Sequence, residues 1–434
     1  MAEVRLITLD PGHFHAALVQ KEMVPGVAKQ VHIYAPLGAD LVAHLQRIAG
    51  FNARSDNPTG WELEIHTGPD ALQRMLRDRL GNLVVLSGRN REKIDRILAA
   101  VEAGLNVLAD KPWILSLEDL PKLQAALDAA DANRVIAYDM MTERHEITSL
   151  MQRELVNDPD IFGDICVGTE DEPGVYMESV HYLLKTVAGV PLRRPAWFFD
   201  IREQGEGLTD VGTHLVDLVF FILFPNQSIQ FQQEIQVLSA KRWPTNLTKD
   251  RFQQVTGLAE FPDFLSSFIQ EDRLAYYCNT LVSYTVRNIH TKLSILWKLE
   301  AVAGSGDTHL AVFRGSRSQV AVRQTKAENF KPEVYVKPNR VGDRTGVLAA
   351  LQAKVSALQA RFPGIQVQHL GDEWRVAIPD AYRVGHEAHF AQVTKQCLSY
   401  ISELISLPAW EKPNMLAKYF VTTQGVHKSR QATG

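Results

Sequence analysis

The chain has 434 residues, which is enough for two or three domains with substantial hydrophobic cores. Hydrophobic residues make up 45% of the sequence and charged residues 22%, proportions that are typical of soluble globular proteins. The 46 Lys and Arg residues nearly balance the 50 Asp and Glu residues, so the net charge of -4 argues against both a nucleic-acid-binding protein and a disordered acidic chain.

The first third of the chain alternates short apolar strands with amphipathic helices. Strands are expected at 4–9, 30–34, 82–86, 105–109 and 135–138, and helices at 15–22, 93–103 and 117–132. This alternation with short connections predicts an α/β fold, in which a doubly wound parallel sheet is covered by helices on both faces. Ligands of such a sheet bind beyond the carboxyl ends of the strands, where the polar clusters of this region stand.

After about residue 146, strands predominate. Runs typical of strands lie close together at 281–286, 293–299, 310–313 and 320–323, as in an antiparallel sheet. An amphipathic helix at 347–358 and strands at 365–369 and 374–378 form an insertion at about 343–380, and residues 387–407 are helical. We therefore expect a first domain at 1–145 and a second α/β domain at 146–434.

Targeting signals and cysteine usage indicate the compartment. The first ten residues are typical of a strand and lack the apolar stretch that a signal peptide needs. The longest apolar run, at 215–225, contains Asp217 and is too short to span a bilayer. The three cysteines are widely spaced and form no CxxC pair, so neither a disulfide scaffold nor a zinc cluster is expected. We expect a cytoplasmic protein without membrane segments, although a cleaved export signal would leave no trace here.

The strongest chemical signal is GEGLTDVGTHLVD at residues 205–217, where a glycine-rich loop leads into a helix. Asp210 and His214 are four residues apart, or roughly 40° around a helix, so they share one face. Asp217 follows one turn later on the same side. A histidine beside a carboxylate can accept a proton near neutral pH. The spacing also fits a buried histidine that packs near a helix-start aspartate.

A second signal is Asp110-Lys111-Pro112, directly after a predicted strand. The proline takes the chain out of the sheet and leaves Lys111 at the edge where ligands collect. Taken alone, a Lys-Pro pair after a strand is most often an ordinary exit loop.

In order and spacing, the two signals together resemble the Gfo/Idh/MocA oxidoreductases, the family of glucose–fructose oxidoreductase and inositol dehydrogenase. Its hallmarks are Glu-Lys-Pro, replaced here by Asp110-Lys111-Pro112, and D-x-x-x-H-x-x-D, matched by Asp210, His214 and Asp217. The phrases DPGHFHAALV, ERHEIT, GEGLTDVGTHLVDL and GHEAHF are similar to the branch with a distinct C-terminal domain. The resemblance implies an NAD(P)-binding Rossmann domain, followed by a C-terminal α/β domain with a large, mainly antiparallel open sheet.

The resemblance also implies an activity. It is hydride transfer between NAD or NADP and a secondary hydroxyl group of a sugar, polyol or glycoside, such as the 3-hydroxyl of a pyranoside. His214 would accept the hydroxyl proton, Lys111 would hold the reacting oxygen, and Asp210 would orient the substrate or His214. Family members commonly associate through the exposed face of the second sheet, so we expect a homodimer or homotetramer.

The cofactor-binding residues implied by the resemblance lie at strand ends of the first domain: Gly12, His13, Phe14, Ser87, Asn90, Asp110 and Lys111. The first turn of the family reads GxGxxG, whereas residues 10–15 read DPGHFH and keep only Gly12. Asp10 places a negative charge near the phosphate position, which His13 and His15 could compensate. The second strand ends at Tyr34 rather than at the acidic residue that binds the ribose, so the sequence does not distinguish NAD from NADP.

The candidate substrate-binding residues precede or follow the glycine-rich loop: Arg144, Glu178, His181, Lys185, Trp197 and Asp217. Arg144 follows the last strand of the first domain, where the family often carries a substrate-facing Arg. Trp197 could stack on the face of a sugar. Each of these residues, taken alone, also fits a surface or packing position.

Three other functions stay open at this point. One is a glycosidase of the same fold, in which tightly held NAD oxidises the sugar transiently, the glycosidic bond eliminates, and the cofactor is regenerated. Another is a non-catalytic sugar-binding or regulatory relative, which would fit the reduced glycine motif. The third is a metal-dependent hydrolase of the β/α-barrel type, because His13-x-His15 after a first strand can hold one metal ion. The oxidoreductase interpretation needs no metal.

Overall fold

The structure, a computed structural model, describes residues 3–187, 190–302, 305–403 and 405–432. It divides into two compact units, each of which is made from more than one stretch of the chain. The first unit comprises Met1–Thr142, Arg202–Gln204 and Gly385–Lys412, and the second comprises Glu143–Ile201, Gly205–Val384 and Pro413–Gly434. Residues 385–412 thus belong to the first unit, whereas the sequence analysis assigned everything after residue 145 to a second domain.

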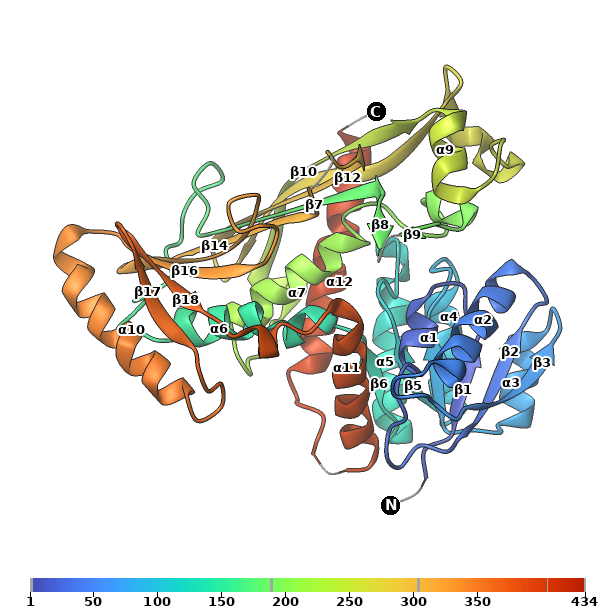
Figure 1. The fold of residues 1–434 in the computed structure, drawn as a ribbon. Coiled ribbons are helices and arrows are strands. Elements are labelled where there is room, and N and C mark those ends of the chain that lie inside the picture. Colours follow the sequence, from blue (N-terminus) through green and yellow to red (C-terminus); the bar gives the residue numbers. More distant parts are fainter. Residues whose placement is uncertain (1–2, 188–189, 303–304, 404, 433–434) are drawn as a thin grey trace. The chain divides into compact units, whose positions relative to one another are not determined.

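The first unit is built on a parallel sheet (Figure 1). Among the described residues, six strands form it in the order β3-β2-β1-β4-β5-β6. The strands are β1 Leu6–Leu9, β2 Gln30–Ala35, β3 Glu62–Thr67, β4 Leu83–Leu86, β5 Asn106–Ala109 and β6 Ala137–Asp139. This is the strand order of the Rossmann fold, so the predicted doubly wound sheet is confirmed. Because the sheet is open and not a barrel, the interpretation as a barrel-type hydrolase is wrong.

Six α-helices of the described residues belong to the first unit: α1 His15–Leu18, α2 Ala39–Ala53, α3 Ala71–Asp78, α4 Lys93–Glu102, α5 Leu120–Asn133 and α11 His386–Ile401. The apolar residues Ile94, Ile97 and Val101 recur at helical spacing and bury one face of α4. Helix α11 contacts α1 and β5, and its Phe390 and Val393 are buried in the same core as β1 and β2. Helix α11, which lies late in the chain, therefore completes the core of the first unit.

The second unit is built on a large sheet. Among the described residues it runs β10-β12-β13-β7-β14-β15-β16-β18-β17, with β11 paired to β12. The strands are β7 Val175–Leu184, β10 Ile235–Leu247, β11 Ile269–Gln270, β12 Arg273–Val286, β13 Ile289–Glu300, β14 Thr308–Arg314, β15 Ser318–Gln324, β16 Glu333–Pro338, β17 Gln366–Leu370 and β18 Glu373–Ala377. Strands β13 and β7 are parallel, and the other described neighbours are antiparallel, which confirms the predicted mainly antiparallel sheet. A separate short hairpin consists of β8 Thr186–Val187 and β9 Val190–Pro191.

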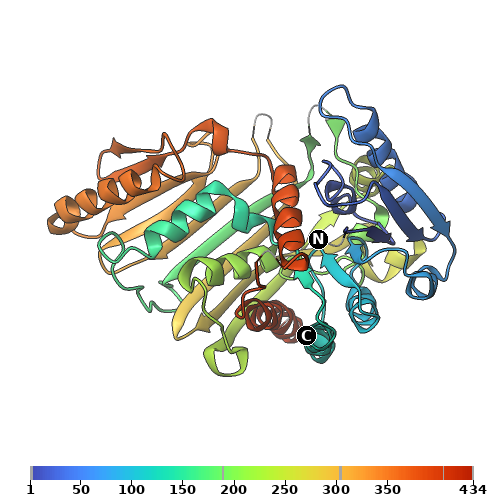
Figure 2. The ribbon, with the colours of Figure 1, turned by 90° about the horizontal axis from the view of Figure 1, so that it is seen from below.

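Helices cover one face of this second sheet. Figures 1 and 2 show α6, α7 and α10 on the same side of it. Apart from α11, the described α-helices that follow α5 are α6 Ile147–Val156, α7 Val211–Leu223, α8 Phe231–Glu234, α9 Lys249–Thr256, α10 Arg344–Leu358 and α12 Glu411–Gln431. Short 3-10 helices are η1 Leu117–Asp119, η2 Thr142–His145, η3 Ala196–Phe199, η4 Asp263–Phe268, η5 Val341–Asp343 and η6 Asp380–Tyr382. The helix and strands expected at about 343–380 are α10, β17 and β18, and the two strands extend this sheet.

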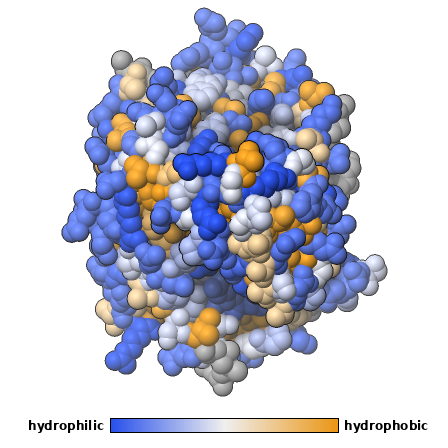
Figure 3. Space-filling model, turned by 90° about the vertical axis from the view of Figure 1, so that its left-hand side faces the viewer, coloured by the Kyte–Doolittle hydropathy of each residue, from blue (hydrophilic) through white to orange (hydrophobic). Residues whose placement is uncertain are grey.

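The longest apolar run of the sequence forms most of α7. Its side chains, among them Leu215, Val219 and Ile222, are buried in the core of the second unit. No helix within the described residues is long and apolar enough to cross a membrane. On the face that Figure 3 shows, hydrophilic side chains predominate and apolar ones are scattered among them.

Candidate functional site

In the first unit, the loops after β1 and β4 are in direct contact. The chain turns at Asp10, whose φ of 46° lies in the left-handed region. The N–H groups of Gly12 and His13 both donate to the carbonyl oxygen of Ser87, each at 3.1 Å. A Cβ atom on Gly88 would lie 2.7 Å from the carbonyl oxygen of Asp10, so only glycine fits there. The strand ends that were predicted to bind a cofactor therefore meet between β1 and β4, where the strand order reverses.

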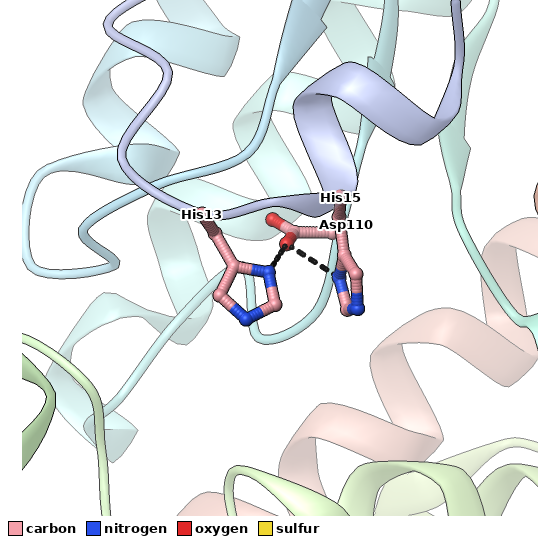
Figure 4. A group of neighbouring side chains, drawn as sticks. All are labelled: His13, His15 and Asp110. Atoms are coloured by element: carbon pink, nitrogen blue, oxygen red, sulfur yellow. Dashed lines mark hydrogen bonds and ion pairs between the residues drawn. The ribbon is translucent and has the colours of Figure 1, made fainter. Parts of the chain in front are cut away.

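Asp110, directly after β5, is the centre of a buried polar cluster in this unit (Figure 4). Its carboxylate accepts a hydrogen bond from Ser87 Oγ at 2.6 Å and one from Lys93 Nζ at 2.5 Å. Figure 4 shows both His13 and His15 pointing at this carboxylate, with Nδ1 atoms 3.5 and 3.1 Å from Asp110 Oδ2. Lys93 Nζ also donates to the backbone oxygen of Asp110 at 2.9 Å. The predicted residues His13, Ser87 and Asp110 thus share one cluster.

The charges in this cluster compensate one another. Burial by itself would raise the pKa of Asp110, but the Lys93 ammonium and the hydrogen bonds to His13 and His15 hold it well below its usual range. Burial lowers the pKa of Lys93, against the attraction of Asp110. Burial and the neighbouring His13 lower the pKa of His15 well below its usual value, so His15 is neutral at pH 7. Asp110 is therefore an ionised carboxylate whose main partner is a buried ammonium.

The contacts of Asp10 and Asn90 bear on whether this edge of the sheet fits a dinucleotide. Asp10 pairs with Arg96 at 2.6 Å, which neutralises the carboxylate that would otherwise repel a phosphate. The N–H of Asn90 donates to the Glu203 carbonyl and its Nδ2 to the Gln204 carbonyl. The Oδ1 atom of Asn90 is buried and has no hydrogen-bond partner among the described residues. Such an acceptor is suited to a ligand donor, so these residues fit a dinucleotide.

The remaining predicted residues of the first unit are Phe14 and Lys111. The ring of Phe14 lies 4.5 Å from that of His13, between centroids. Lys111 is partly buried, its peptide bond to Pro112 is cis, and its charge contributes to the lowered pKa of Lys93. Lys111 therefore lies next to the Asp110 cluster at the carboxyl end of β5, as predicted.

In the second unit, the glycine-rich loop is fixed on strand β12. A Cβ atom on Gly207 would lie 2.0 Å from the carbonyl oxygen of Cys278, so the loop backbone approaches the strand more closely than any side chain would allow. The buried carboxylate of Glu206 pairs with Arg242 at 2.6 Å and with Arg430 at 2.9 Å. These contacts hold the start of α7 in place.

Asp210 and His214 lie at that start. Asp210 is the buried N-cap residue of α7, and His214 is partly buried one turn later on the same helix face, as predicted. The charge of Asp210 adds to the burial that raises the pKa of Tyr276. Burial lowers the pKa of Arg194, and the charges of Tyr276 and Asp210 oppose that shift. Asp210 thus lies in a buried environment close to a cation and a phenol.

Asp217, a further turn along α7, is part of a buried ion-pair group. It accepts two hydrogen bonds from Arg144, each at 2.7 Å, and a third from Lys418 Nζ at 3.2 Å. Burial would raise the pKa of Asp217, but these two cations hold it below its usual range. Two residues predicted to bind substrate, Arg144 and Asp217, are therefore paired with each other, which favours a role in positioning α7.

His181, on β7, belongs to a second histidine–carboxylate group. Its Nε2 lies 2.7 Å from Ser179 Oγ and its Nδ1 lies 3.2 Å from Asp307 Oδ2. Lys185 Nζ donates to the same carboxylate oxygen at 2.7 Å. Burial would raise the pKa of Asp307, but His181 and Lys185 lower it below its usual value. The predicted pair His181 and Lys185 is thus brought together by Asp307, which the sequence analysis did not single out.

Glu178 and Trp197 are the remaining predicted residues of the second unit. Glu178 projects from the opposite face of β7 to Ser179 and His181, because side chains alternate along a strand. Its carboxylate accepts a hydrogen bond from the Tyr176 hydroxyl at 3.0 Å. Trp197 lies in η3 and is only 4% exposed.

Sequence reasoning missed the Trp297 ring beside His181 and the Arg194 guanidinium that lies over this ring. The Trp297 ring on β13 lies 4.9 Å from the His181 ring, because these residues are paired across the parallel strands. The Arg194 guanidinium lies over the rings of Trp297 and Phe198, at 5.0 and 4.5 Å. The aromatic content of β13 is a sequence signal, but only the strand pairing shows which histidine it faces.

Comparisons with known proteins found relatives of this chain. The family model described as "Putative oxidoreductase C terminal domain" matches residues 151–430. No curated protein matches the chain. A structure described as a "putative oxidoreductase" from Parabacteroides merdae ATCC 43184 is 44% identical, with a TM-score of 0.97, and covers 99% of this chain and 98% of that one.

Two more distant structures are similar in fold. A "putative myo-inositol dehydrogenase" from Sinorhizobium meliloti 1021 is 14% identical, with a TM-score of 0.56 and coverage of 99% of this chain and 98% of that one. KijD10, a 3-ketoreductase from Actinomadura kijaniata in complex with NADP and TDP-benzene, is 12% identical, with a TM-score of 0.55 and coverage of 96% and 95%.

Proposed function

Because the chain belongs to the Gfo/Idh/MocA family of oxidoreductases, we propose that it transfers a hydride between NAD or NADP and a secondary hydroxyl group of a sugar, polyol or glycoside. The first unit binds the dinucleotide and the second unit binds the substrate. The three cysteines are free thiols, which fits a reducing compartment, and we place the enzyme in the cytoplasm.

The observation that carries this proposal is the meeting of three strand ends at the switch point of the first sheet. Gly12 contacts Ser87, and Ser87 in turn bonds to Asp110. Dinucleotides bind at this place in sheets with this strand order. KijD10, which has the same fold, was solved with NADP, and this supports the assignment of a nicotinamide cofactor.

When bound, the nicotinamide supplies the position that accepts or donates the hydride. The residues of this chain handle the proton and the developing charge. His214 accepts the proton of the substrate hydroxyl group, since an imidazole one turn from a carboxylate is suited to this near neutral pH. Lys111 stabilises the negative charge that develops on the reacting oxygen.

The His181 group provides the polar contacts for the substrate. The carboxylate of Asp307, shared by His181 and Lys185, offers donors and acceptors next to the Trp297 ring. Sugars present hydroxyl groups at the rim and apolar C–H groups on their faces. A polar cluster beside an aromatic ring matches both, which favours a sugar or polyol as the substrate.

Fluorescence titration with NADH and NADPH tests the cofactor assignment. Gly12→Val places a branched side chain in the turn after β1, and we expect affinity to fall by about tenfold or more. The matched control is Gly50→Ala on α2, where a Cβ atom meets nothing within 4 Å, and it should bind like the wild type.

Unchanged affinity in Gly12→Val would show that the dinucleotide does not lie across this turn. A wild-type protein that binds neither nucleotide would contradict the proposed function and favour a non-catalytic relative. Recycling of bound NAD without net reduction would instead indicate the glycosidase.

A further inference from the structure

A group of metal-binding side chains lies on β2 and β3, separate from the Asp110 cluster. His32 is on β2, and Glu64 and His66 are on β3. In the parallel register His32 pairs with Glu64 and Tyr34 pairs with His66. Because paired residues project to the same side and alternate residues along each strand do so too, all three candidate ligands share one face of the sheet.

The ligand atoms of these three residues are spaced as around a metal ion. His32 Nδ1 lies 3.3 Å from His66 Nε2, His32 Nδ1 lies 3.5 Å from Glu64 Oε2, and His66 Nε2 lies 3.6 Å from Glu64 Oε1. Ligands bound tetrahedrally to Zn²⁺ at ~2.0–2.2 Å are ~3.3–3.6 Å apart from one another. The His32–His66 distance is also that of a hydrogen bond, whereas the contacts to Glu64, made through its two different oxygens, are too long for good hydrogen bonds. One ligand atom from each residue lies within 4.8 Å of the other two, which is close enough for all three to bind one ion.

The surroundings of the three residues also suit metal binding. The side chains of His32 and His66 are both buried. The Tyr34 ring stacks on His66 at 4.3 Å between centroids, and Gln30 Nε2 donates to Glu64 Oε2 at 2.9 Å. These outer contacts orient an imidazole and the carboxylate, as is usual around metal ligands. The side chain of Glu64 is 47% exposed, which gives the ion a path from solvent.

The Asp110 cluster is less suited to a metal ion, although His13, His15 and Asp110 also bring ligand atoms together. Its carboxylate is already bound by the buried Lys93 ammonium and by Ser87. A divalent cation there would be placed next to a buried positive charge, which costs electrostatic free energy. In the group of His32, Glu64 and His66, by contrast, no Lys or Arg among the described residues forms an ion pair with Glu64 within 4 Å.

We propose that His32, Glu64 and His66 form a binding site for one divalent transition-metal ion, with Zn²⁺ as the reference metal. Two imidazoles and one carboxylate match the preferences of Zn²⁺ and of Co²⁺ or Ni²⁺, and they leave a fourth position for water. The ion links the edge strand β3 to β2. This site takes no part in the proposed hydride transfer, so either proposal can fail without the other.

Calorimetric titration of the chelator-treated full-length protein with ZnCl₂ tests the site. We expect one equivalent of Zn²⁺ to bind the wild type, and Glu64→Gln to bind it about tenfold more weakly or worse, since even outer-shell changes cost that much. Glu62→Gln is the matched control. Glu62 is exposed on the same strand and face but is not one of the three ligands, so its substitution should leave Zn²⁺ affinity within about twofold of the wild type.

Co²⁺ provides a second readout, because its visible absorption reports on coordination. The bands of a four-coordinate Co²⁺ site should appear in the wild type and in Glu62→Gln, and should be lost in His66→Gln. A His13→Asn/His15→Asn double variant should keep them. The proposal would be overturned if the wild type did not bind Zn²⁺ or if Glu64→Gln bound it with wild-type affinity. It would also be overturned if the His13→Asn/His15→Asn variant lost the Co²⁺ bands while His66→Gln kept them.

Discussion

Replacing Asp110 with Asn removes the charge that compensates the buried Lys93 ammonium. Lys93 Nζ lies 2.5 Å from Asp110 Oδ1, and both residues are almost completely buried. Removing one partner of such a pair typically costs about 3–5 kcal/mol, because the other charge stays buried without compensation. We expect about 3 kcal/mol for Asp110→Asn, at the lower end, because the bond from Lys93 to the Asp110 backbone oxygen persists.

The control for this change is Asp95→Asn. Asp95 pairs with Lys122 at 2.8 Å, but both side chains are about half exposed, so its substitution should cost no more than about 1 kcal/mol. Adding Lys93→Met to Asp110→Asn removes the uncompensated ammonium. The double variant should therefore recover stability relative to Asp110→Asn, although each change is destabilising alone.

Urea unfolding, combined with hydrogen exchange of the β4 and β5 peptides, measures these differences. The pKa of Asp110 lies well below its usual range, so its contribution to stability is present at neutral pH and is lost as the pH falls through that lowered value. The deficit of Asp110→Asn should therefore shrink in acid. A neutral-pH deficit no larger than that of Asp95→Asn would refute the reasoning.

Three other predictions concern the second unit. Burial raises the pKa of Glu146 from 4.5 to about 7, so the free energy of unfolding of the wild type should fall by up to about 3 kcal/mol as the pH rises from 5 to 8. In Glu146→Gln the free energy of unfolding should fall much less, and an equal fall of the urea midpoints in both proteins would contradict this. Gly207→Ala should destabilise the protein by about 1–3 kcal/mol, because its Cβ atom would lie 2.0 Å from the Cys278 carbonyl oxygen. The control is Gly342→Ala, whose Cβ atom would meet nothing within 4 Å, and thermal unfolding should show its stability within about 0.5 kcal/mol of the wild type. Light scattering at micromolar concentration should give a dimer or tetramer, and a monomer would count against the expected association through the second sheet.

The sequence predicted those strands of the first unit that are short apolar runs ended by glycine or polar residues. Such runs are typical of strands buried on both faces of a parallel sheet, and β1, β4 and β5 are of this kind. Strand β3 was not predicted, because it lies at the sheet edge and most of its side chains are exposed, so no apolar run marks it. The group of His32, Glu64 and His66 was missed for the same reason, since two of its members lie on β3.

At the candidate site, local motifs were predictable and long-range pairings were not. The shared helix face of Asp210 and His214 follows from their spacing alone. The pairing of Asp217 with Arg144 and Lys418 joins segments far apart in the chain, and no local pattern reveals it. The same holds for α11, whose amphipathic pattern shows a buried face but not that this face completes the core of the first unit.

The reduction of NAD or NADP by a panel of sugars, polyols and glycosides, followed by nicotinamide absorbance, tests the central claim most directly. We expect the wild type to reduce the cofactor with at least one of these substrates. His214→Asn should lower turnover by about a hundredfold or more, as loss of a general base does, while cofactor affinity stays within a few-fold. No net reduction with any member of the panel, or wild-type turnover in His214→Asn, would contradict the account.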